Sequence, residues 1–228
     1  MIVEIHLQQK SQFFYNKVEI LCLKYENKIT KENSILFYKR KAYPNSVKAY
    51  SCDSGMTFVN EIEDKKLSEF VAGLLFEHEK EFKITPAAKL MHHNYIGGLM
   101  VHTIECVQFA EHNLKMFMMK LNRDIMIAAC ILHDIGKIFE YTIDLETGIV
   151  DYDENFRSEW ISHSQYGFSL CMMNGFKRIA KMIAAHHGRE DWGAMIDLDQ
   201  KDLEPELYFL HFMDNLSAKF GKISVSDL

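Results

Sequence analysis

Two carboxylates in apolar surroundings are the residues of this sequence best placed to do chemistry. Asp134 follows His133 directly after the apolar run "AACIL", and Asp214 shares a helical stripe with Leu207 and Leu210. An unpaired ion is very costly to bury, so each carboxylate must be neutralised, hydrogen-bonded or bound to a cation. We find no Lys or Arg on the same helix faces, and the sequence therefore predicts a bound metal ion.

Histidines at helical positions supply the matching nitrogen ligands. His102 lies on the inward face of a predicted helix, His163 begins another, and His186 and His187 end a third just before Gly188. Imidazole with carboxylate suits manganese, iron, nickel or zinc better than an oxygen-only magnesium or calcium site. We expect two divalent metal ions, because Asp134 has two oxygens and could bridge them. The predicted ligands are His102, His133, Asp134, His163, His186, His187 and Asp214.

Each of these signals is weak alone. A single His-Asp pair, or a histidine pair before a glycine, is as easily structural, and a buried histidine can simply be hydrogen-bonded in the core. The prediction rests on the whole ordered set, which lies within one helical region.

The composition is that of a soluble globular protein. The chain has 228 residues, of which 48% are hydrophobic and 25% charged, enough for one domain with a small appendage. No long apolar run predicts a membrane span, and no secretory signal is visible, so we expect a cytoplasmic protein without membrane contact. Five cysteines without a CxxC pair argue against a cysteine zinc site.

The elements that must position these side chains are mostly helices. Residues 1–66 predict a small α/β appendage with a helix and a hairpin, and residues 67–228 predict an all-α helical bundle. One amphipathic helix is expected over "LSEFVAGLLFEHEKEF", and a central buried helix over "DIMIAACILHD". For the buried helix we expect Asp124 as the N-cap and Gly136 as the C-terminal stop.

The order H…HD…H…HH…D resembles the HD-domain superfamily of metal-dependent phosphohydrolases. Within it, four stretches resemble the HD domain of YhaM-type 3′ to 5′ exoribonucleases, over about residues 67 to 221. These stretches are "PAAKLMHHNYIGGLMVHT", "AACILHDIGKIFEY", "AAHHGREDWG" and "LHFMDNLSAKF". The resemblance implies an all-α HD-domain bundle for residues 67–228.

The resemblance also divides the ligands between two metals. It assigns His102, His133, Asp134 and Asp214 to the first metal, and Asp134 with His163, His186 and His187 to the second. Lys137 of the HDxGK motif would contact a substrate phosphate, which makes Asp134 and Lys137 the expected catalytic residues. Arg189 could add positive charge at the substrate. His92 and His93 match paired histidines of the family, and substrate contact and structural packing both stay open for His93.

The expected activity is hydrolysis of a phosphodiester or phosphate ester by metal-activated water. The expected partner is a small phosphorylated substrate, namely a nucleotide, a cyclic dinucleotide or a short oligonucleotide. YhaM-type enzymes carry an N-terminal OB-fold, whereas residues 1–66 lack a five-strand pattern. This difference and the net charge of −6 argue against extended RNA binding. A homo-oligomer stays open, as do two other classes, a di-iron oxygenase and a non-catalytic nucleotide-binding regulatory module.

Overall fold

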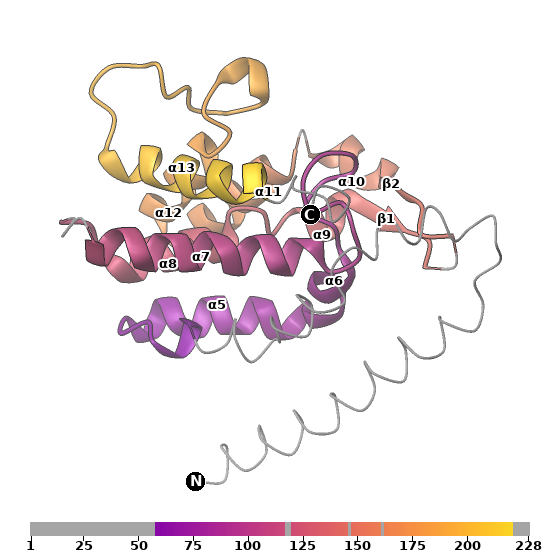
Figure 1. Cartoon of the computed structure of the whole chain (residues 1–228), viewed down its shortest axis with the longest axis horizontal. Coiled ribbons are helices and arrows are strands. Elements are labelled where there is room, and N and C mark those ends of the chain that lie inside the picture. The colour runs from indigo at the N-terminus through magenta and orange to yellow at the C-terminus, as the bar shows by residue number, and fades with distance from the viewer. Residues whose placement is uncertain (1–57, 117–119, 146, 161, 221–228) are drawn as a thin grey trace, which may run out of the picture.

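A computed structural model of the chain describes residues 58–116, 120–145, 147–160 and 162–220 (Figure 1). The appendage helix and hairpin expected before residue 53 lie outside this part. Val59 and Ile62 belong to the same core cluster as Leu67 and Val71, so the packed core includes residues before 67. The division of the chain at residue 66 stays a prediction.

Helix α8, Arg123–Leu132, is the centre of the bundle. It contacts α5 (Lys65–Glu77), α7 (Gly98–Met116), α12 (Lys177–Ala185) and α13 (Pro205–Phe220). In Figure 1, α5 lies on one side of α7 and α8, and α13 lies on the other. In α8, residues Met126 to Leu132 are all buried, which confirms the predicted central helix.

Five further helical elements complete the fold around this centre among the described residues. They are α6 (Glu79–Ile84), α9 (Lys137–Glu140), α10 (Glu154–Glu159), α11 (His163–Met173) and a 3₁₀ turn at Glu190–Trp192. The predicted all-α class is confirmed for the described residues. None of the helices among them is long and apolar enough to cross a membrane.

A small antiparallel pair in the second half of the chain was not predicted. Strand β1, Tyr141–Ile143, pairs with β2, Val150–Tyr152, in the register Tyr141 to Tyr152. Gly148 has a φ of 70°, and its amide donates to the Asp144 carbonyl to close the turn. The pair directly follows α9, so it extends the segment that carries Lys137.

Asp124 is not the N-cap of α8, as we had expected. Asn122 caps the helix, because its side chain accepts a hydrogen bond from the Ile125 amide at 3.0 Å. Asp124 lies in the first turn instead, where Oδ2 accepts from the amides of Glu63 and Asp64 at 2.8 and 2.9 Å. The carboxylate therefore joins the start of α5 to α8.

The prediction of a single helix over residues 67–82 is also wrong. His78 has φ −110° and ψ 26°, and it separates α5 from α6. Its ring packs edge-on against Phe139, with 5.0 Å between the ring centroids. The turn at His78 redirects the chain so that α6 contacts α7.

Gly136 has a different role from the predicted one. Its φ is −63°, which any residue can adopt, so it does not end α8 through a left-handed conformation. A Cβ at this position would lie 2.5 Å from the His163 carbonyl oxygen and 2.8 Å from its Cα. Glycine is required because the start of α11 packs directly on the turn after α8.

Candidate metal centre

The bundle brings all seven predicted ligands into two adjoining clusters. His102 comes from the second turn of α7, Asp214 from α13, and His133 and Asp134 from the turn after α8. The other three lie at helix ends, where α11 begins and α12 finishes: His163, His186 and His187. Most of these side chains are buried, with His102 and His133 fully so.

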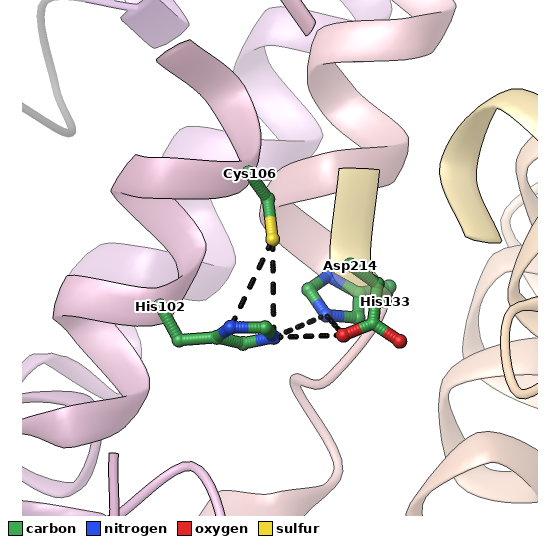
Figure 2. Close-up of side chains that lie close together, drawn as sticks. All are labelled: His102, Cys106, His133 and Asp214. Carbon is green, nitrogen blue, oxygen red and sulfur yellow. Dashed lines mark hydrogen bonds and ion pairs between the residues drawn. The ribbon is translucent and has the colours of Figure 1, made fainter. Parts of the chain in front are cut away.

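The first cluster gathers around His102 Nε2. This atom lies 3.1 Å from His133 Nε2, 3.2 Å from Asp214 Oδ1 and 3.5 Å from Asp134 Oδ2. Figure 2 shows His102, His133 and Asp214 facing one another from three parts of the chain, with Cys106 beside His102.

Cys106 is a neighbour of the first cluster that the sequence analysis did not assign. Its Sγ lies 3.8 Å from His102 Nε2 and donates to the Met213 carbonyl at 3.7 Å. Burial raises the pKa of this thiol well above its usual value. Cys106 is therefore a neutral contact of His102 in this structure.

The second cluster gathers around the other oxygen of Asp134. His163 Nε2 lies 3.3 Å from Asp134 Oδ1 and 3.2 Å from His187 Nε2. His186 Nε2 lies 3.6 Å from the same oxygen. Asp134 Oδ1 and His186 Nε2 are buried and have no hydrogen-bond partner among the described residues. Such orphaned acceptors are what a cation would satisfy.

The hydrogen-bond partners of the Nδ1 atoms determine which ring nitrogen of each histidine carries the proton. His133 Nδ1 lies 2.8 Å from the Cys130 carbonyl, and His186 Nδ1 lies 2.7 Å from the Ile183 carbonyl. His163 Nδ1 lies 2.7 Å from Glu140 Oε2. Carbonyl and carboxylate oxygens only accept, so each Nδ1 donates and each neutral ring presents the Nε2 lone pair inward. The donor set therefore fits divalent metal ions.

Burial and neighbouring charges keep the cluster in a suitable ionisation state. Burial lowers the pKa of His102 and His163, and it lowers that of His187 to about 2, so these imidazoles are neutral. Burial would raise the pKa of Asp134, but the charges of Lys137 and His133 outweigh it and hold it well below the usual value. The pKa of Asp214 is also lowered against the effect of burial, chiefly by His102, whose Nε2 lies 3.2 Å from Oδ1.

His133 differs from the other rings. Burial lowers its pKa, but the charges of Asp134 and Asp214, together with the contacts to Asp134 and the Cys130 carbonyl, outweigh burial and raise it. A proton on His133 Nε2 would relieve the contact of two lone pairs between His102 and His133 in the absence of metal. The position between these nitrogens is therefore one that attracts a cation.

Lys137 corrects our statement that no basic residue could pair with the buried aspartates. Its ammonium Nζ lies 2.6 Å from Asp134 Oδ2, and both side chains are buried. Lys137 follows Asp134 by three residues, so one helical turn brings the two together. In this structure the lysine supplies part of the charge that Asp134 requires.

The two other predicted substrate contacts lie in different surroundings. Arg189 is half exposed, and its Nε donates to Asp191 at 2.9 Å. His93 is 3% exposed, and its Nε2 lies 3.1 Å from Glu105 Oε2. The ring of His92 is nearer to His102, with 4.8 Å between centroids against 5.5 Å for His93.

Sequence reasoning missed three residues that support the ligands: Glu105, Glu140 and Ser217. Glu140 accepts from His163, and Ser217 lies 2.8 Å from His102 Nδ1. A signal was present, because Glu105 follows His102 by three residues and Ser217 follows Asp214 by three. Residues three apart share a helix face.

The fold and the clustered ligands define the class of protein. The chain belongs to the HD domain family, whose profile matches residues 99–219.

Two curated relatives are similar to most of this chain. The 3′-5′ exoribonuclease YhaM of Geobacillus sp. (strain WCH70) is 26% identical over 180 residues, covering 73% of this chain and 51% of the relative. The 3′-5′ exoribonuclease YhaM of Bacillus subtilis (strain 168) is 25% identical over 183 residues, covering 74% and 54%. The chain thus spans about half the length of these relatives. No solved structure matches it significantly.

Proposed function

We propose that this protein hydrolyses a phosphodiester or phosphate ester in a nucleotide, a cyclic dinucleotide or a short oligonucleotide. The reaction would take place at the two clusters that share Asp134. One observation supports this proposal most: ring nitrogens from four helices and their ends face the two oxygens of a single buried carboxylate, namely those of His102, His133, His163 and His186. Without a cation, so many converging acceptors would be costly.

The proposed first metal is held by His102, His133, Asp134 and Asp214. The proposed second metal is held by Asp134, His163, His186 and His187. Mixed imidazole and carboxylate donors favour manganese, iron, nickel or zinc. Metal ions bound there would lower the pKa of a bound water towards neutrality and offset negative charge on the substrate phosphate.

The residues of the chain prepare the site for this chemistry. The neutral rings of His102, His163 and His187 offer lone pairs without first losing a proton. Glu140 and the Ile183 carbonyl orient two of the rings through their Nδ1 atoms. Burial of Asp134 and its neighbours excludes bulk water, which strengthens every electrostatic contact in the site.

We propose that Lys137 binds a phosphate oxygen of the substrate. Its ammonium is held 2.6 Å from Asp134 Oδ2 in this structure. Divalent cations on Asp134 would make this ion pair unnecessary and repel the ammonium. The flexible side chain could then turn to a phosphate, to which a point charge is well suited.

The relatives support hydrolysis over the two other classes considered. Both are named as exoribonucleases, and such an enzyme cleaves phosphodiester bonds. The complete set of seven candidate ligands supports an active rather than a purely regulatory site. Because the chain spans about half of each relative, RNA is one substrate to test beside nucleotides and cyclic dinucleotides.

The test is Asp134→Ala, since this residue belongs to both clusters. We expect the variant to lose bound metal and to lose hydrolysis of a bis-aryl phosphodiester, while its helical circular-dichroism spectrum is kept. Glu69→Ala, which removes an exposed carboxylate on α5, serves as the matched control and should change neither. Full activity in Asp134→Ala, or a wild-type protein that binds no divalent metal, would contradict the proposal.

A further inference from the structure

A chain of hydrogen bonds runs outward from His102, on the side away from the two clusters. His102 Nδ1 lies 2.8 Å from Ser217 Oγ on α13. The Ser217 hydroxyl in turn donates to Glu105 Oε2 on α7 at 2.7 Å. Ser217 is fully buried, so its hydroxyl depends on these two partners.

The direction of this chain determines the tautomer of His102. A carboxylate only accepts, so Glu105 accepts the hydrogen bond that the Ser217 hydroxyl donates. Ser217 Oγ must then accept from His102, which places the ring proton on Nδ1 and leaves the Nε2 lone pair free. Asp214 Oδ1, 3.2 Å from Nε2, favours the opposite tautomer when no metal is bound. Glu105 and Ser217 oppose that preference.

His93 donates a second hydrogen bond to the same oxygen of Glu105. Its Nε2 lies 3.1 Å from Glu105 Oε2, so a single oxygen accepts from both His93 and Ser217. Two donors of this kind, together with the more distant His102, lower the pKa of Glu105 against the opposing effect of burial. The carboxylate is therefore ionised, as the acceptor role requires.

The backbone at His93 is strained and held in place. His93 has a φ of 45°, which is rare for a residue with a side chain. Its carbonyl accepts from the Ala87 amide at 3.1 Å, and it lies so close to Gly98 that a Cβ there would come within 1.9 Å. Strain of this kind persists only where the surroundings enforce it, often beside functional groups. Here it aims the His93 ring at Glu105.

We infer that Glu105 and Ser217 are positioning residues that keep His102 in the tautomer able to bind metal, with His93 fixing Glu105. This inference rests on the proposed function, in which His102 holds a metal. The outer partners of metal-binding histidines commonly set ring orientation and proton position. The alternative is a purely structural role, in which Ser217 and Glu105 only join α7 to α13.

Two substitutions separate these readings. Ser217→Ala removes the acceptor of the His102 proton, and Glu105→Met frees the Ser217 hydroxyl to donate to Nδ1. Both should shift metal-free His102 towards the tautomer protonated on Nε2, seen as changed ring ¹⁵N shifts in histidine-labelled protein. Both should also weaken Zn²⁺ and Mn²⁺ binding by about 10- to 100-fold, measured by competition with a chromophoric chelator.

Two controls exclude a loss of packing as the cause. Ser217→Thr keeps a hydroxyl and should restore the tautomer and most of the metal affinity. Ser164→Ala removes another buried hydroxyl, one without a hydrogen-bond partner among the described residues, and should leave both measurements unchanged. Thermal melts of every variant report whether the fold is kept.

The outcomes distinguish this inference from the proposed function. Wild-type protein that binds no divalent metal contradicts the proposed function, while the ring ¹⁵N shifts still decide the tautomer. Wild-type protein that binds metal, with His102 shifts and affinity unchanged in Ser217→Ala and Glu105→Met, overturns the inference. A shift in both variants with recovery in Ser217→Thr supports it.

Discussion

Asp134 takes part in both clusters because its two oxygens face different sets of side chains. Oδ2 lies near His102 and His133, and Oδ1 lies near His163 and His186. Lys137 also pairs with Oδ2. The lysine and a metal ion are therefore alternative ways to offset the same buried charge.

Lys137→Met tests this exchange. In the presence of a chelator, we expect the free energy of unfolding to fall by about 3 kcal/mol, because a buried carboxylate loses its cationic partner. With saturating Mn²⁺ the deficit should be clearly smaller, since the metal neutralises Asp134. Urea unfolding under the two conditions provides the measurement.

Lys181→Met is the matched control for that experiment. Lys181 Nζ lies 2.7 Å from Glu204 Oε1, nearly the same distance, but both side chains are about half exposed. Solvent screens such a pair, so we expect little change in stability. An equal deficit for Lys137→Met with and without Mn²⁺ would contradict the exchange.

Single residues show what the sequence could and could not indicate. The seven candidate ligands, which stay a prediction, were proposed because buried carboxylates, an inward-facing histidine and helix-end histidines are visible in the sequence. The pairing of Lys137 with Asp134 was missed because we compared helix faces and not the turn that follows a helix. Glu105 and Ser217 were missed because each looks like an ordinary helix residue until its partner on the other helix is known.

At the scale of elements, the contact between the turn after α8 and the start of α11 aligns the two clusters. Gly136 permits this contact, because any side chain there would meet the His163 backbone. His163 is itself a candidate ligand, so the turn controls its distance from Asp134. The sequence could not predict this role, since it depends on two segments that are far apart in the chain.

Gly136→Ala should push α11 away from the turn after α8. We expect lower stability in thermal melts and weaker metal binding by competition with a chelator, because His163 would move from Asp134. Gly73→Ala is the control, since a Cβ there meets nothing within 4 Å in the middle of α5. That change should stabilise the protein by about 0.5 to 1 kcal/mol. Normal metal affinity in Gly136→Ala would refute this view of the turn.

Helix positions were predicted better than their ends. Apolar spacing placed the long helices, but the cap of α8 is Asn122 and not Asp124, and His78 divides a segment that reads as one helix. The strands β1 and β2 were missed because three residues each are too few for a clear alternation. Ends and short strands depend on tertiary contacts more than on local pattern.

For the whole molecule, metal binding should stabilise the folded helical bundle against unfolding. The candidate ligands come from α7, α8, α11, α12 and α13 or from their ends, so an ion can bind fully only to the folded bundle. A metal at 100 times its dissociation constant would add about 2.7 kcal/mol to the free energy of unfolding. For a chain of this size, that corresponds to about 5 to 10 °C in Tm.

Removal of metal with a chelator should therefore lower Tm by a similar amount, and Mn²⁺ should restore it. Differential scanning calorimetry of the full chain measures both steps. In Asp134→Ala, the melting temperature should not respond to metal. A wild-type Tm that is the same with chelator and with Mn²⁺ would show that no ion joins these helices.

The separation of the ligands along the chain also has a consequence for folding kinetics. The contacts of α7 with α8 and of α11 with α12 join neighbours in sequence, whereas α13 must return across about a hundred residues to reach α7. Closing so long a loop costs entropy and slows folding. We therefore expect Asp214 to reach His102 late in folding, so that the first cluster is completed after the contacts between neighbouring helices have formed.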